Sequence, residues 1–362
     1  ELVDTGHAYY CFCTADRLAE MRKDQEANHK PPMYDGTCKK LKLEKKEPHG
    51  IRLNVPDEGV TTFHDEIRGD ISFKNALIDD QVLLKSDGFP TYHLGVVVDD
   101  HLMEISHIIR GEEWISSTPK HILLYQFLGW TPPVFAHMPL LRNPDKSKLS
   151  KRKNPVWVGD YKAKGFLPEA ILNYLATLAW AHPTGRDIFS IEEMVEAFKL
   201  EDVQTTAPIF DIEKLRWMNK QYLMKKSPQE FKTLVSTASI YHNEPNFDQV
   251  AQGTATLVQP RISISSEYDS MISPIFRRPE RPERPLNRNL LKLLLFALES
   301  CEWREDAMEK AIRSVAEKNK IKAKDLFMEL RVVVTGNTVG LPLLELLKQI
   351  GKEETLSRLS IG

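Results

Sequence analysis

The sequence contains no long uncharged apolar run and few cysteines. Its densest apolar stretch, residues 290–298, is interrupted by Lys292 and is far too short to cross a bilayer. Four cysteines in 362 residues do not make a disulfide framework, so we expect a reducing compartment, the cytoplasm. The first residues also lack the basic start and apolar core of a signal peptide. These absences argue against a helical membrane protein and against a small disulfide-rich secreted one.

An excess of positive charge is also absent. The 49 basic and 51 acidic residues give a formal net charge of -2, which excludes a generally basic surface but leaves room for a local basic face. A hydrophobic content of 41% is enough for sizeable cores. A length of 362 residues suggests two or three domains.

The first part of the chain mixes strand and helix patterns. Apolar spacing and turn residues predict a helix over 14–29 and strands at 51–55, 71–73 and 82–84. Gly95–Val98 is a continuous apolar run, which is typical of a parallel strand buried on both faces.

The next segment predicts a single βαβ unit. It has a strand pattern at 105–109, a helical pattern over 119–128 and an apolar segment at 134–136. We therefore expect part of an open parallel sheet.

From residue 167 the pattern is helical almost to the end. The periodic stretches are 168–181, 191–198, 212–223, 229–238, 290–300, 304–318, 323–330 and 342–351. Residues 279–289 are rich in proline and arginine, which is typical of a linker or turn between helical subdomains.

The most informative string is the basic loop at 143–153. Five of its eleven residues are basic: Lys146, Lys148, Lys151, Arg152 and Lys153. Several cations in one polar loop can stabilise the charge that develops on a leaving pyrophosphate. A solvated basic loop or a nucleic-acid patch is the alternative on composition alone.

The order of residues favours the first interpretation. Lys148-Leu-Ser-Lys-Arg152 resembles the KMSKS signature of class I aminoacyl-tRNA synthetases, and the whole chain resembles bacterial-type glutamyl-tRNA synthetases. The strings that carry this resemblance, in chain order, start at 8 (AYYCFC), 34 (YDG), 86 (SDGFPTY), 97 (VVDDHLM), 109 (IRGEEW), 137 (HMPLL), 165 (GFLPEA), 210 (FDIEKLRW) and 334 (VTG).

The resemblance implies an incomplete Rossmann-like α/β nucleotide-binding domain with an α+β insertion, followed by all-α C-terminal domains. It places an acceptor-arm-binding insertion at 1–90, with the tail of the first half of the nucleotide fold. The second half of that fold lies at 91–150, a helical stem-contact domain at 151–225 and an anticodon-binding region at 226–362, with a subdomain boundary near 284.

The implied reaction is ligation of L-glutamate to tRNA(Glu) with ATP and Mg²⁺, by a monomer; whether tRNA(Gln) is also accepted stays open. The family's HIGH signature is not in this sequence, so we expect that the natural N-terminus is missing and that the chain alone is inactive. The alternative is a non-catalytic tRNA-binding module derived from such a synthetase.

The resemblance also implies residue roles. Lys151 and Lys148 are the catalytic candidates, and ATP is expected at Glu113, Leu141, Lys148, Leu149, Ser150, Lys151 and Arg152. Glutamate is expected at Tyr92, Val96 and Arg110, because a guanidinium pairs well with a carboxylate. Without the family, Arg110 could form a surface ion pair with Glu112 or Glu113, and Tyr92 could be a core aromatic.

Two positions depart from the family pattern. Val96 stands where the family usually has asparagine, so a hydrogen bond to the amino acid is lost, at a cost of roughly 1–3 kcal/mol. Glu104 stands where the family has a small residue.

Two further groups of residues, three cysteines and five arginines, are candidates for binding a metal ion and tRNA. Some relatives bind zinc at the positions of Cys11, Cys13 and Cys38, but the next expected ligand is Lys40, so the three thiols lack a fourth ligand and we expect no metal. Five arginines precede the last helices and suit a phosphate backbone as well as a solvated linker: Arg277, Arg278, Arg281, Arg284 and Arg288.

Overall fold

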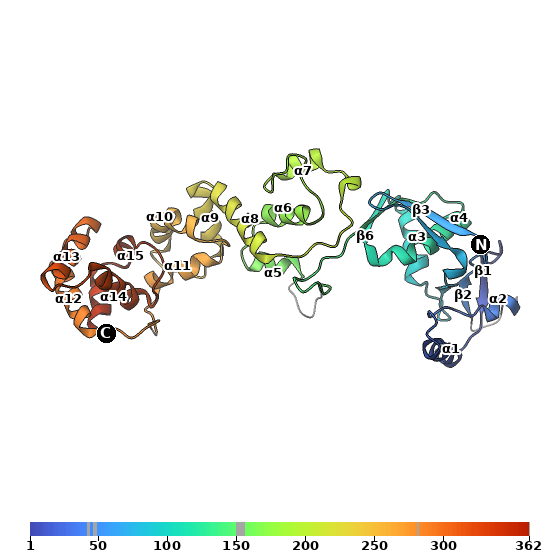
Figure 1. Ribbon diagram of the computed structural model, residues 1–362, viewed down its shortest axis with the longest axis horizontal. Coiled ribbons are helices and arrows are strands. Elements are labelled where there is room, and N and C mark those ends of the chain that lie inside the picture. The colour runs from blue at the N-terminus through green and yellow to red at the C-terminus, as the bar shows by residue number, and fades with distance from the viewer. Residues whose placement is uncertain (42–43, 46–48, 150–155, 281, 362) are drawn as a thin grey trace. The chain divides into compact units, whose positions relative to one another are not determined.

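The computed structural model describes residues 1–41, 44–45, 49–149, 156–280 and 282–361. The expectations for Ser150, Lys151, Arg152, Lys153 and Arg281 lie outside these residues. The chain forms two compact units (Figure 1). Unit 1 contains residues 1–148, 178–185 and 195–210, and unit 2 contains residues 149–177, 186–194 and 211–362.

Unit 1 begins with a small antiparallel sheet. Its strand order is β1 (Ala8–Cys11), β2 (Gly50–Leu53), β5 (Val82–Leu84). The helix after β1, α1 (Ala15–Ala27), begins where the sequence predicts it, because the Thr14 side chain accepts from the backbone N–H of Arg17. A short helix, α2 (Thr37–Leu41), follows.

The second sheet of unit 1 is mixed. Its order is β4 (Gly69–Lys74), β3 (Val60–Asp65), β7 (Val134–Met138), β6 (His107–Gly111). Strands β3 and β4 form an antiparallel hairpin, whereas β7 runs parallel to both β3 and β6. The helix α4 (Thr118–Leu128) connects β6 to β7, so the predicted βαβ unit is confirmed.

The expected strand at Gly95–Val98 is wrong. These residues lie inside a helix, α3 (Tyr92–Leu102). Only Val97 of the apolar run is fully buried, and it packs in one core with Leu123 and Leu124 of α4. One buried face is what a helix needs, so tertiary packing outweighs the preference of a valine run for strands.

The C-terminal region is helical, as predicted. Its helices are α5 (Val158–Ala163), α6 (Pro168–Ala179), α7 (Ile191–Ala197), α8 (Ile212–Lys225), α9 (Pro228–Ala238), α10 (Phe247–Val258), α11 (Glu267–Phe276), α12 (Arg288–Glu299), α13 (Glu305–Lys318), α14 (Ala323–Thr335), α15 (Leu343–Ile350) and α16 (Lys352–Ile361). The short 3-10 helices of the chain are η1 (Asn75–Leu77), η2 (Glu112–Ser117), η3 (Leu200–Asp202) and η4 (Gln259–Arg261).

Two apolar cores lie among the described residues of unit 2. One centres on residues such as Phe231, Val258 and Ile272, and the other on Leu294 and Met308. Residues 277–287 connect α11 to α12, where a linker is predicted. Among the residues that the structure describes, none of the helices combines the length and apolar character that a membrane span needs.

Candidate functional site

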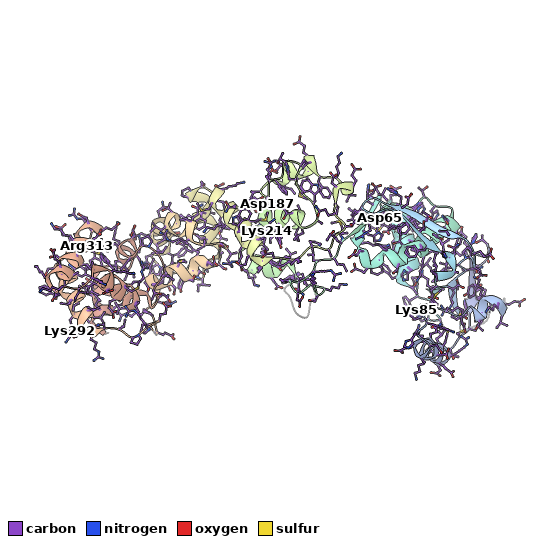
Figure 2. All side chains as sticks on the ribbon, viewed as in Figure 1. Asp65, Lys85, Asp187, Lys214, Lys292 and Arg313 are labelled. Carbon is purple, nitrogen blue, oxygen red and sulfur yellow. The ribbon has the colours of Figure 1, made fainter. Side chains whose placement is uncertain are left out.

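Three chain segments bring polar side chains to one end of the mixed sheet. Arg110, near the end of β6, is paired in register with His137 on β7. Asp65, labelled in Figure 2, is the last residue of β3 and pairs with Phe135 of β7. The carboxyl ends of parallel strands are the usual ligand sites of open α/β sheets. The candidate site is therefore built around Arg110.

The guanidinium of Arg110 is half-buried and is held by two neutral acceptors. Its Nε donates to Nε2 of His137 at 3.1 Å, and its Nη2 donates to the hydroxyl of Thr118 at 2.8 Å. Burial is the main cause that lowers the pKa of Arg110, while nearby Tyr92 and Asp100 oppose it. Within the described ranges Arg110 forms no salt bridge, so a partly desolvated cation is left for an anion from outside.

The neighbouring acids do not pair with Arg110. Glu112 binds Arg68 at 2.6 Å, and Glu113 lies 3.7 Å from Lys148. The alternative interpretation of Arg110 as part of a surface ion pair with either acid is therefore wrong.

Tyr92 and Val96 occupy one face of α3. Residues four apart on a helix lie on the same side, so this face continues to Asp100. Tyr92 is 51% exposed and its ring centroid lies 5.0 Å from that of Trp114. The guanidinium of Arg110 lies 5.6 Å from the same Trp114 ring. Tyr92 is therefore not a core aromatic, and it lies beside Arg110.

An unpredicted pair, Asp65 and His137, lies fully buried behind Arg110. Nδ1 of His137 bonds to Asp65 Oδ2 at 2.6 Å, and Asp65 also accepts from the backbone N–H groups of Ile67, Arg68 and His137. Burial lowers the pKa of His137 more than Asp65 raises it, which favours a neutral imidazole.

The sequence carries a signal for this pair. Along Val60–Asp65 the residues alternate between exposed and buried, and the buried positions are Thr61, Phe63 and Asp65. A carboxylate at the inward position of an alternating strand needs a buried partner. Only the tertiary structure shows that this partner is His137, 72 residues later.

Two of the residues expected at ATP lie close together. They are Glu113 and Lys148, whose charged groups lie 3.7 Å apart. The Glu113 carboxylate also lies over Gly111, where an added Cβ would be 2.1 Å from Oε2. Gly111 therefore allows this carboxylate conformation.

A tight turn presents Lys148. Arg142 forms a β-bridge with Lys148, and the backbone N–H of Asn143 donates to Ser147 at 2.9 Å. Lys146 has a φ of 65°, which allows the reversal. The rest of the signature loop, except Leu149, lies outside the described residues.

Leu141 follows β7 and is half-buried, as is Leu149. The backbone N–H of Leu140 donates to Glu112 at 3.4 Å, and that of Arg142 donates to Pro208. The chain on either side of Leu141 is therefore held by hydrogen bonds, which suits a role for its backbone.

The three predicted thiols cluster. The Sγ atoms of Cys11, Cys13 and Cys38 lie within 4.8 Å of one another, and the Tyr34 hydroxyl lies 3.2 Å from Cys13. Two guanidiniums, of Arg17 and Arg52, contact Cys13 and Cys11 at 3.3 Å. The absence of a metal stays a prediction, but its argument is weaker because Tyr34 adds a fourth donor atom. Tyr34 belongs to the YDG string and lies four residues before Cys38, but no ligand role was expected for it.

The arginines expected at tRNA are mostly engaged within the protein. Arg277 pairs with Glu244, Arg278 forms two hydrogen bonds with Glu354, and Arg284 pairs with Glu329. Arg288 is exposed at the start of α12, and its side chain has no partner among the described residues. Arg288 is therefore the most available of those described.

Two families match successive parts of the chain. The family described as tRNA synthetases class I (E and Q), catalytic domain, matches residues 1–217. An anticodon binding domain matches residues 201–362. The fold is thus that of a class I aminoacyl-tRNA synthetase, in agreement with the predicted fold class.

Individual relatives narrow the family. The glutamate–tRNA ligase of Acinetobacter baumannii is 40% identical over 378 residues, 99% of this chain and 74% of the relative. That of Acidothermus cellulolyticus is 41% identical over 99% of this chain and 76% of the relative. A crystal structure of the enzyme from Elizabethkingia meningosepticum, in complex with its amino acid, has a TM-score of 0.80 at 31% identity and covers 99% of this chain and 80% of that one. The chain belongs to the glutamate–tRNA ligase family.

Proposed function

We propose that this chain binds L-glutamate at Arg110 for ATP-dependent activation and transfer to tRNA. The observation that carries the proposal is the unpaired charge of Arg110. This guanidinium is half-buried, its acceptors are neutral, and the acids next to it in sequence bind other cations. A substrate carboxylate would supply the missing anion through paired hydrogen bonds.

The other roles follow from position. Tyr92 and Val96 line the side of the glutamate pocket formed by α3. Glu113, Leu141, Lys148 and Leu149 contact ATP, which brings its Mg²⁺ with it. We further propose that Lys148 acts with Lys151 on the departing pyrophosphate, and that Ser150 and Arg152 complete this loop.

The partner is tRNA(Glu), and acceptance of tRNA(Gln) is left open. We propose a cytoplasmic monomer, with the domain limits that the sequence predicts at 90, 150 and 225 and a further subdomain boundary near 284. Arg288 is the first candidate for a phosphate contact, since the side chains of Arg277, Arg278 and Arg284 already have acidic partners.

The test is ATP–pyrophosphate exchange with glutamate, with and without tRNA, in this chain and in a polypeptide that also carries a HIGH element. In the active form, Arg110→Gln lowers kcat/KM for glutamate by about 100-fold, because it removes charged hydrogen bonds to the carboxylate. The control is Arg22→Gln, an exposed arginine on α1, which leaves KM for glutamate unchanged. Full activity of the Arg110 variant would contradict the proposal. Binding of tRNA without exchange in either form would favour the non-catalytic module.

A further inference from the structure

We propose that His137 is a positioning residue for Arg110, and that a buried hydrogen-bond chain of Asp65, His137, Arg110 and Thr118 sets the direction of the guanidinium. The proposal rests on the proposed function of Arg110. It assigns a role to Asp65, His137 and Thr118, none of which the sequence motifs placed at the glutamate site.

The hydrogen bonds define the donors and acceptors along Asp65, His137 and Arg110, and the Thr118 hydroxyl lies 3.2 Å from Nε2 of His137 as well as near the Trp114 carbonyl. Asp65 accepts at 2.6 Å from Nδ1 of His137, so Nδ1 carries the proton and Nε2 is left with a lone pair. That lone pair accepts from Nε of Arg110 at 3.1 Å. The hydroxyl of Thr118 donates to the carbonyl of Trp114 at 3.0 Å, so it accepts from Nη2 of Arg110 at 2.8 Å. Donors and acceptors therefore match at each link.

The same contacts determine which edge of the guanidinium is free. An arginine has five N–H donors in a planar fork. His137 and Thr118 take one donor from Nε and one from Nη2. The second N–H of Nη2 and one N–H of Nη1 form the adjacent, end-on edge of the same plane. The Tyr92 side chain also interacts with this guanidinium. The end-on edge can hold a carboxylate with two parallel hydrogen bonds.

The carboxylate of Asp65 also anchors the backbone. It accepts from three backbone N–H groups, so its removal would disturb the turn after β3 as well as the imidazole. Thr118 offers a cleaner test, because valine has nearly the shape of threonine and lacks only the hydroxyl.

The experiment compares Thr118→Val, Thr118→Ser and His137→Gln in the active synthetase. We expect Thr118→Val to raise KM for glutamate roughly 10-fold and His137→Gln to raise it more, with KM for ATP changed less than about 2-fold. Thr118→Ser restores the hydroxyl and most of the glutamate affinity. The matched control is Thr254→Val, another fully buried threonine whose hydroxyl is hydrogen-bonded, located in α10.

A spectroscopic measurement tests the hydrogen-bond chain without any assay. ¹⁵N NMR of histidine-labelled protein at neutral pH should show His137 neutral, protonated at Nδ1 and unprotonated at Nε2. A charged imidazole or the opposite tautomer would overturn the proposal, as would equal rises in KM for glutamate and ATP. If Arg110→Gln itself leaves glutamate binding intact, the proposed function fails. If Arg110→Gln loses glutamate binding but the Thr118 and His137 variants keep it, the proposed function stands and only the positioning role of His137 is wrong.

Discussion

The two units of this chain bury polar groups in different settings. In unit 1 the buried Asp65, His121 and His137 lie around one arginine, at the ends of parallel strands and the start of a helix. In unit 2 the buried charges Glu329 and Arg358 join helices and the α11–α12 connection.

The two buried charges of unit 2 have partners within the protein. Glu329 accepts from Arg284 and from the backbone N–H of Asn287, and Arg358 donates to the carbonyls of Pro274 and Val334. At the surface, Lys214 and Asp187 pair at 2.9 Å and are both labelled in Figure 2. In unit 1, by contrast, the donors of Arg110 are only partly used. A half-buried cation without an acidic partner indicates a ligand site, whereas the paired charges of unit 2 connect segments of the fold.

The largest expected change in stability comes from the apolar core of unit 2 whose helices also carry the buried charges Glu329 and Arg358. Leu294 of α12 is fully buried in the second core of unit 2, so Leu294→Ala should lower the free energy of unfolding by about 2–5 kcal/mol. The control on the same helix is Phe296→Ala, since Phe296 is 75% exposed; it should change stability by less than about 0.5 kcal/mol. Urea denaturation measures both. Equal losses would show that α12 does not bury the face described above.

A smaller effect, on the pH dependence of stability, is expected from His121 of unit 1. Burial, aided by nearby Arg110 and His93, lowers the pKa of His121 to about 3. The pKa of a histidine in an unfolded chain is about 6.5. Between about pH 3 and this value, the unfolded state therefore takes up a proton that the folded state does not. Stability should therefore fall with falling pH, by up to about 1.4 kcal/mol per unit, and should not depend on this group above about pH 6.5.

Denaturation at several pH values between 7.5 and 4.5 checks this slope, and His121→Gln should reduce it. His64 provides an opposite control: it is exposed, and the hydrogen bond that its Nδ1 donates to Asp70 raises its pKa. Its contribution is present at low pH and is lost as pH rises. A His121 variant with an unchanged slope would show that this imidazole titrates normally.

The smallest effect on stability is expected at Lys148. Its contact with Glu113 is 3.7 Å long and the two side chains are 61% and 42% exposed, so Lys148→Met should change the free energy of unfolding by less than about 0.5 kcal/mol. KM for ATP in the exchange assay should nevertheless rise. Lys85→Met is the control, because Lys85 also forms an exposed ion pair, with Asp87. An equal KM for ATP in both variants would remove Lys148 from the proposed nucleotide site.

Much of the secondary structure was predictable from local pattern. The cap at Thr14, the βαβ unit and most C-terminal helices follow from spacing that each segment carries itself. The helices α10 and α11 were not predicted, because they contain Gly253 and Pro274, residues that normally argue against a helix. An added Cβ at Gly253 would lie 2.4 Å from Nε2 of Gln349, so the end of that side chain would have to move aside.

The candidate site was predictable only in part. The motif strings pointed to Arg110, Tyr92 and Glu113, but composition could not decide between a buried cation and a surface ion pair. The structure decides this, since Glu112 binds Arg68 and Glu113 lies near Lys148. The partnership of Asp65 and His137 had no local pattern that joined the two, because it depends on the pairing of β3 with β7.

The sequence by itself determined the family and the order of its parts, because ordered motifs and helical periodicity are properties of the chain read from end to end. The tertiary structure alone decided that residues 95–98 form a helix and that the charge of Arg110 has only neutral partners in the described chain. Both depend on which distant residues exclude water from a side chain, and that exclusion exists only once the strands and helices have packed together.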